Sequence, residues 1–192
     1  MGTENTDNLG LAVHHRLEGS LERMIRTYQD QLYSYAQSIL HNSFDAQEVT
    51  QDAFLGAYRA LTMKYDEARC RNLELRPWLF RIIRNLALNR LRARRTVQEE
   101  PFAVLASEPA ARPDTRTGHG FWNLLDQELL ELAQAKLKPA ARELVALRFM
   151  EGLSYAEIAR VLGTTEASAR GKVFRALQSL KEELREHEVG LK

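Results

Sequence analysis

Arginine dominates one segment of this chain and gives it a clear binding chemistry. Nine arginines lie between residues 69 and 95, where Glu74 is the only acid, so the segment carries a formal charge of +8. Such a density of positive charge attracts phosphate groups. Trp78, Asn85 and Asn89 lie in the same segment, and these side-chain types suit bases that have left the stack. The pattern predicts a nucleic-acid surface, although Trp78 could equally be a core residue.

A second set of cations lies near the C-terminus. Arg170, Lys172 and Arg175 alternate with small and apolar residues at helical spacing, which predicts that the cations lie opposite a buried face. The second helix of a helix-turn-helix presents such side chains to base edges in the major groove. Thr165 and Ser168 could add phosphate contacts near the start of this helix. The alternative is a plain helical hairpin with a solvated basic face.

An acidic stretch precedes the arginine-rich segment. Its polar residues are Asp45, Gln47, Glu48, Gln51 and Asp52. A face of this kind is usually a solvated surface. Beside a basic surface it could instead dock a protein partner.

Residues for enzymatic or metal chemistry are sparse. Cys70 is the only cysteine and the five histidines are scattered, so we expect no catalytic pair, metal site or cofactor. Cys70 lies among arginines, which could lower its pKa and give it a redox role. No apolar run is long enough to span a membrane, and Met1–Gly10 has no apolar signal core, so we expect a cytoplasmic protein without membrane insertion.

The apolar residues of the segments that carry these side chains recur at three and four positions, which predicts helices throughout. We expect an all-α fold of two small helical domains joined by a flexible linker, with a helix-turn-helix in the C-terminal one. The predicted boundaries are a flexible tail over 1–17, an N-terminal domain over 18–95, a proline-containing linker over 96–120 and a C-terminal domain over 121–192. In the N-terminal domain, an apolar stripe that begins at Leu21 predicts the first helix. A second helix is expected to start near Asp45, with Asp45 as its N-cap and the Glu48 side chain bonding back to the cap. A third helix is expected from Pro77 to Arg94.

Local signals in the C-terminal domain are more explicit. Pro139 can open a helix that Gly152 ends. Ser154 and Glu157 form a capping box for the next helix, and Gly163 supplies a left-handed stop. Thr165 can cap the last helix.

Assembled in this order, the sequence resembles the extracytoplasmic-function (ECF) sigma factors of bacteria. One block that carries the resemblance is Asp45–Tyr58 followed by Arg76–Arg90, and the other runs from Gly152–Gly163 to Val173–Leu177. The second block occurs in many regulators, but both blocks in this order are highly specific. The loop between Tyr65 and Trp78 is longer than is usual in the family, and Gly171 stands where the family often has serine.

The resemblance implies a role for each surface. The second helix would dock on core RNA polymerase through Asp45, Glu48, Gln51, Asp52 and Tyr58. The following loop and third helix would bind the minus-ten promoter element and a flipped base through Lys64, Arg69, Arg71, Arg76, Trp78, Arg84, Asn85, Asn89 and Arg92. The C-terminal domain would read the minus-thirty-five element through Thr165, Ser168, Arg170, Lys172, Phe174 and Arg175. The family also implies an anti-sigma partner.

Two other functions stay open from the sequence. A conventional helix-turn-helix repressor or activator would explain the C-terminal third, and it would favour a stable dimer on a two-fold symmetric operator. An enzyme would depend on Cys70 as a redox residue, since no other catalytic constellation is visible.

Overall fold

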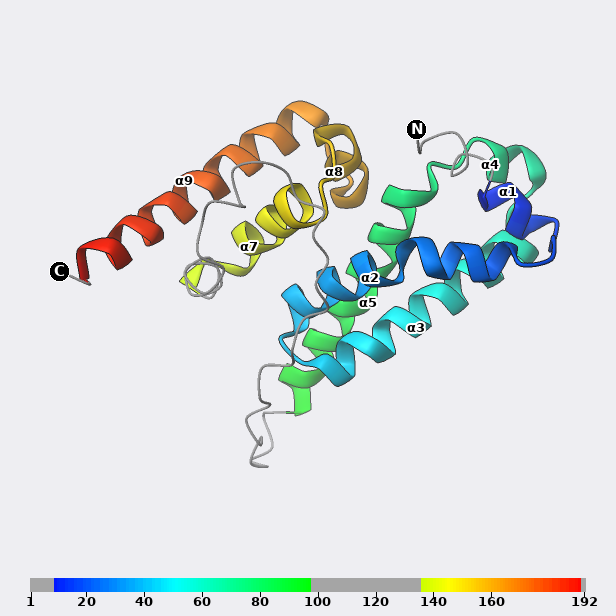
Figure 1. The fold of residues 1–192 in the computed structure, drawn as a ribbon, viewed down its shortest axis with the longest axis horizontal. Coiled ribbons are helices and arrows are strands. Elements are labelled where there is room, and N and C mark those ends of the chain that lie inside the picture. The colour runs from blue at the N-terminus through cyan, green and yellow to red at the C-terminus, as the bar shows by residue number, and fades with distance from the viewer. Residues whose placement is uncertain (1–8, 98–135, 191–192) are drawn as a thin grey trace. The chain divides into compact units, whose positions relative to one another are not determined.

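The computed structural model describes the backbone of residues 9–97 and 136–190, and the side chains of residues 9–94 and 136–185. Every regular element in these ranges is helical (Figure 1), which confirms the all-α prediction for them. The chain divides into two compact units, residues 1–115 and 116–192. The predicted linker lies almost wholly outside the described residues, apart from its first two, which end a helix.

Three long helices form the first unit: α2 (Ser20–Leu40), α3 (Ser43–Arg59) and α5 (Leu75–Val97). Each of them packs against the other two (Figure 1). The predicted stripe of α2 turns inward, and Tyr35 is fully buried with its ring centroid 5.4 Å from that of Phe80 on α5. Burial of such large side chains is the main stabilising contribution to a small helical unit.

The start of α3 differs from the prediction. Asn42, not Asp45, is the N-cap, and its side chain accepts the backbone N–H of Asp45 at 2.9 Å. His41 adopts a left-handed conformation with φ 50°, and this conformation ends α2. Helix α3 therefore begins at Ser43, earlier than the predicted start near Asp45. Asn and Asp are equally good caps, so local preference could not choose between them. As a result Asp45 is the third helical residue and is buried.

The predicted N-terminal tail is wrong for residues 9–14. Leu9–His14 forms a short helix, α1, whose Leu9, Gly10 and Val13 are buried. It packs against the segment between α3 and α5, where the sequence shows no clear period. That segment contains a π-helical turn, η1 (Ala60–Lys64), and a short helix, α4 (Glu67–Arg71). Six residues are too few to show a helical repeat, which is why α1 was missed.

The second unit contains α7 (Pro139–Val145), a π-helical turn η3 (Ala146–Met150), α8 (Tyr155–Leu162) and α9 (Glu166–Gly190). α9 packs against both α7 and α8 (Figure 1). Pro139 is the first residue of α7, as predicted, and Gly152 after η3 has φ 67°. The helical pattern expected from residue 121 to 135 lies outside the described residues.

The predicted helix-turn-helix signals are present in this unit. Glu157 N–H donates to Ser154 Oγ at 3.2 Å, and Ser154 N–H donates to the Glu157 carboxylate at 2.8 Å, so the capping box is complete. Gly163 ends α8 with φ 65°. Thr165 Oγ1 accepts the Ser168 N–H at 3.2 Å and caps α9.

Candidate nucleic-acid interfaces

The exposed face of α9 has the composition expected of a DNA-reading helix. Ala169, Val173 and Ala176 are buried against the rest of the unit. The residues predicted to contact the minus-thirty-five element remain at least partly accessible; Thr165, Arg170, Phe174 and Arg175 are exposed, and Ser168 and Lys172 are half-buried. Phe174 is 60 % exposed, so its ring is accessible to a ligand at this face.

A tyrosine on α8 orders one of these arginines. The guanidinium carbon of Arg170 lies 5.3 Å from the Tyr155 ring centroid, and that of Arg148 lies 4.7 Å from it. Arg148 also donates to the Leu153 carbonyl at 2.8 Å, and Arg170 pairs with Glu166 at 3.1 Å within its own turn. Sequence reasoning missed Tyr155 and Arg148, because their contacts join residues on different elements.

In the first unit an aromatic and cationic cluster joins the α3–α5 segment to α5. The Tyr65 and Trp78 ring centroids are 5.7 Å apart, and the Arg69 guanidinium lies over the Tyr65 ring at 3.8 Å. We call Tyr65, Arg69 and Trp78 the stacking cluster. Asp66 caps α4 by accepting the Arg69 N–H at 2.8 Å, and this fixes the turn from which Arg69 extends. Tyr65 lies in the loop expected to bind the minus-ten element, 64–75, but it was not singled out as a site residue.

Other residues predicted for this surface lie along α5. Asn85, Asn89 and Arg92 are exposed and recur at three and four residues, so they form one stripe. Arg92 donates to the Asn89 side chain at 3.0 Å. Arg76 and Arg84 are half-buried.

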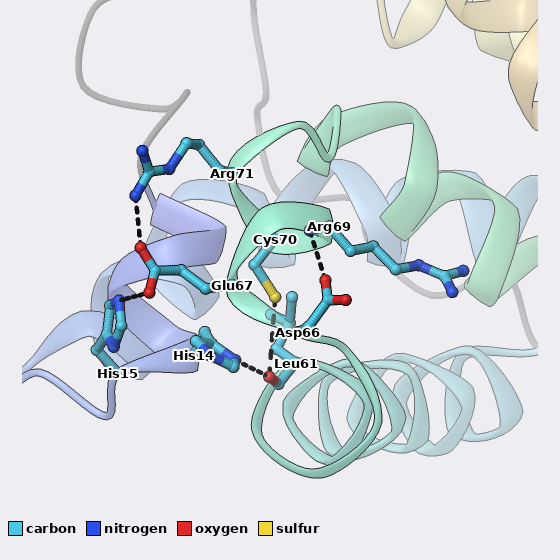
Figure 2. Close-up of polar contacts among 8 residues, drawn as sticks. All are labelled: His14, His15, Leu61, Asp66, Glu67, Arg69, Cys70 and Arg71. Atoms are coloured by element: carbon cyan, nitrogen blue, oxygen red, sulfur yellow. Dashed lines mark hydrogen bonds and ion pairs between the residues drawn. The ribbon is translucent and has the colours of Figure 1, made fainter.

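Two predicted residues of the α3–α5 segment, Lys64 and Arg71, do not take part in the contacts of the stacking cluster described above. Arg71 is paired with Glu67 at 2.5 Å and points away from Arg69 (Figure 2). Lys64, at the end of η1, is exposed. The structure therefore places Arg69 and Trp78 together but not Arg71.

Two arginines of α5 contribute to the fold. Arg94 forms an ion pair with the buried Asp45 of α3, and Arg90 pairs with Glu48 at 2.5 Å and lies 3.8 Å from Asp45. These pairs hold α5 against α3. The formal charge of the arginine-rich segment thus overstates the charge that this unit offers to a ligand.

The predicted docking face of α3 is only partly available. Asp45 is 6 % exposed and ion-paired with Arg94, so its carboxylate supports the fold and is not accessible to a docking partner. Glu48 and Tyr58 are half-buried, whereas Gln51 and Asp52 are exposed. Two apolar side chains on the accessible side were not predicted, namely Phe44 and Leu55, which are 67 % and 54 % exposed.

Cys70 does not have the environment that a redox role would need. Its side chain is fully buried, and burial is the main cause that raises the pKa of its thiol. Asp66 raises this pKa further, while Arg69 opposes the rise. The expected lowering by nearby arginines is therefore wrong.

Residues 9–97 and 136–190 offer neither a metal site nor a membrane span. No three His, Cys, Asp or Glu side chains in these ranges gather as a metal-binding group. No helix in them combines the length and apolar character needed to cross a bilayer.

Comparison with known proteins identifies both units. Residues 24–97 match the model for Sigma-70 region 2, and residues 127–180 match that for Sigma-70 region 4. The chain is 29 % identical over 176 residues to the ECF RNA polymerase sigma factor SigE of Mycolicibacterium smegmatis, covering 88 % of this chain and 63 % of that one. It is 30 % identical over 160 residues to the ECF sigma factor BldN of Streptomyces coelicolor, covering 82 % and 58 %.

A solved structure supports the same fold. The sigma factor RpoE, determined in complex with the anti-sigma factor NepR from Bartonella quintana, matches with a TM-score of 0.68 at 24 % identity, covering 87 % of this chain and 98 % of that one. The chain spans about three fifths of the length of the SigE and BldN relatives. The chain belongs to the sigma-70 family of sigma factors, in its extracytoplasmic-function group.

Proposed function

We propose that this chain binds core RNA polymerase and directs promoter-specific initiation of transcription. The observation that carries the proposal is the pairing of two separate cationic surfaces, one in each matched sigma-70 region. A repressor or activator with one helix-turn-helix would have no use for the second surface. The protein would act without catalysing a reaction itself, in the cytoplasm.

The first unit would bind the minus-ten element. Unpaired bases can stack on aromatic and guanidinium planes, and the stacking cluster supplies both within 6 Å of each other. Asn85, Asn89 and Arg92 extend the surface along α5 with side chains suited to base edges and phosphates. Capturing a flipped base costs a few kcal/mol, which such stacking offsets. Lys64, Arg71, Arg76 and Arg84 would add positive charge to this surface.

The second unit would read the minus-thirty-five element from the major groove. Arg170 and Arg175 are the candidates for base contacts, because arginine can bind guanine with two hydrogen bonds. Thr165, Ser168 and Lys172 would contact phosphates, and Phe174 would contact a thymine methyl or sugar. The Tyr155 ring would limit the conformations of Arg170 before DNA arrives.

The exposed side of α3 would dock on polymerase. Gln51 and Asp52 are exposed there, Glu48 and Tyr58 are partly accessible, and Phe44 and Leu55 provide apolar area at the same face. A mixed polar and apolar face of this kind is typical of regulated protein interfaces. An anti-sigma factor that covers it would keep the protein inactive. This regulation is proposed by analogy with the RpoE–NepR complex.

Co-elution with bacterial core RNA polymerase on a sizing column is the first test. We expect a stoichiometric complex that initiates from a specific promoter, whereas the free protein binds that promoter weakly. Clean separation of a folded, inhibitor-free protein from core polymerase would contradict the proposal. That result, with a stable dimer on a symmetric operator, would favour a conventional regulator.

Two classes of variant test the division of labour between the units. Gln51→Ala combined with Asp52→Ala should weaken binding to polymerase and leave the α9 surface unaffected. Arg170→Ala should weaken upstream promoter contact and leave polymerase binding unchanged. If both variants lose the same activity, the proposed division is wrong.

A further inference from the structure

The π-helical turn after α3 leaves one backbone carbonyl available to another element. In a continuous α-helix the Leu61 carbonyl would accept the Tyr65 N–H. Here the Tyr65 N–H donates to Ala60 at 3.0 Å instead. The Leu61 oxygen accepts from His14 Nδ1 of α1 at 2.7 Å, and Cys70 Sγ of α4 lies 3.9 Å from it (Figure 2). One carbonyl thus joins α1, η1 and α4.

The backbone of α1 also packs closely on the same segment. A methyl group added at the buried Gly10 would lie 3.7 Å from the Cys70 carbonyl oxygen and 3.8 Å from Leu75 Cδ1. It would lie 3.9 Å from Leu61 Cδ2. These distances allow a methyl group but no larger side chain without movement. Helix α1 therefore contacts the start of η1, the end of α4 and the start of α5 at once.

The residues of the stacking cluster lie close to these three contacts along the chain. Tyr65 and Arg69 fall between Leu61 and Cys70, and Trp78 follows Leu75 by less than one turn of α5. A shift of η1 or α4 would move the Tyr65 ring relative to Trp78. Geometric precision of this kind decides whether a flipped base stacks well.

We propose that α1 is a positioning element for the surface that binds the minus-ten element, with His14 as its positioning residue. This inference rests on the proposed function. Helix α1 precedes the segment that matches Sigma-70 region 2, which begins at residue 24. The extra helix fixes a segment whose sequence between Tyr65 and Trp78 is long and has no regular period of its own.

Five substitutions, each made in the whole 192-residue chain, separate this role from general packing. His14→Ala removes the donor to Leu61, and His14→Asn keeps an N–H near the same place. His15→Ala is the matched control, because His15 is exposed and its ring nitrogen lies 4.0 Å from Glu67. Gly10→Leu wedges α1 away from the segment, and Gly10→Ala fits the available space.

The experiment uses holoenzyme with each variant and fork-junction DNA carrying 2-aminopurine at the flipped position of a promoter mapped for the wild type. We expect His14→Ala and Gly10→Leu to weaken binding to this DNA by about three- to tenfold, the effect of one lost hydrogen bond. They should also reduce the 2-aminopurine fluorescence change and flatten the preference among minus-ten base variants. His14→Asn, His15→Ala and Gly10→Ala should resemble the wild type.

Three further measurements decide between the outcomes: polymerase affinity, upstream duplex binding and thermal stability. Polymerase affinity and upstream duplex binding should stay within about twofold of wild type for all variants. If His14→Ala leaves fork-junction binding unchanged, or lowers all three affinities together with thermal stability, α1 has no positioning role. If wild-type holoenzyme shows no minus-ten dependence at all, the proposed function itself fails, and this inference with it.

Discussion

The arginines of α5 and those of α9 have the same charge but different surroundings. Arg90 and Arg94 reach across to acids of α3, with side chains 36 % and 37 % exposed. Arg170 is 65 % exposed, and its ion pair with Glu166 lies within its own helix. Arg175 is also exposed. The first pair of arginines therefore stabilises a unit, while the second pair remains accessible to a ligand.

This difference shows why a count of cations is a poor measure of a binding surface. An ion pair between elements removes both charges from the field that a phosphate would experience. It also makes the arginine a contributor to stability, at a magnitude that depends on burial. Substitutions can distinguish these two roles, because one changes the free energy of unfolding and the other changes DNA affinity.

The largest expected effect is on stability, from Asp45→Ala. Breaking a fully buried ion pair costs about 3–5 kcal/mol. The partners of Asp45, Arg90 and Arg94, are each more than one-third exposed, so solvent weakens these pairs. We therefore expect Asp45→Ala to lower the free energy of unfolding, measured in urea, by about 2 kcal/mol. Asp52→Ala, on the exposed side of α3, should change it by less than about 0.5 kcal/mol. Equal effects of the two variants would mean that the α3–α5 ion pairs do not stabilise the unit.

The next effect is on DNA, from Arg175→Ala. Losing one arginine contact to a base costs about 1–3 kcal/mol, so affinity of the holoenzyme for the upstream duplex should fall at least fivefold. The free energy of unfolding should remain within about 0.5 kcal/mol of the wild type. Lys181→Ala, exposed further along α9, is the matched control. A large loss of stability in Arg175→Ala would show that this arginine, too, supports the fold.

A smaller effect, with the opposite sign, is expected from Gly171→Ala. An added methyl group would meet only Arg175 Nη1, at 3.7 Å, which is an ordinary contact. Alanine is favoured over glycine inside a helix, so the free energy of unfolding should rise by about 0.5–1 kcal/mol. Unchanged upstream binding would show that glycine is merely tolerated here. Weaker binding in the more stable variant would show that DNA approaches the backbone at this position.

The last prediction concerns thiol chemistry in the first unit and tests neither DNA affinity nor stability. Because burial and Asp66 raise the pKa of Cys70, less thiolate forms at a given pH than on an ordinary cysteine. Alkylation by iodoacetamide at about pH 8 should therefore be at least tenfold slower in the folded protein than in urea. Native reactivity should increase only as the pH rises toward the raised pKa. Fast native alkylation would show that Arg69, not burial, controls this thiol.

Local signals explain which parts of the fold were predictable. The second unit contains a proline at a helix start, a capping box and a glycine stop, and each acts on its own neighbours. These elements appear where the sequence predicts them. The start of α3 was misjudged because two good capping residues, Asn42 and Asp45, lie three positions apart.

The parts that could not be predicted depend on contacts between distant residues. Arg90 meets Glu48 across 42 positions of sequence, and His14 meets Leu61 across 47. Such pairs follow from how the helices pack, which a periodic pattern does not specify. The Tyr155 contacts with Arg148 and Arg170 were missed for the same reason. A hydrophobic stripe predicts that a helix is buried on one side but not which residue of another helix it meets.

The π-helical turns limit how segments of this protein can be exchanged with those of other sigma factors. Each one uses an additional residue in a single turn. Deleting one residue from 60–64 would restore α-helical hydrogen bonding through this turn. The Leu61 carbonyl would then accept a backbone N–H of its own helix and would no longer be available to His14. A working chimera should therefore have its junctions outside 60–64 and 146–150.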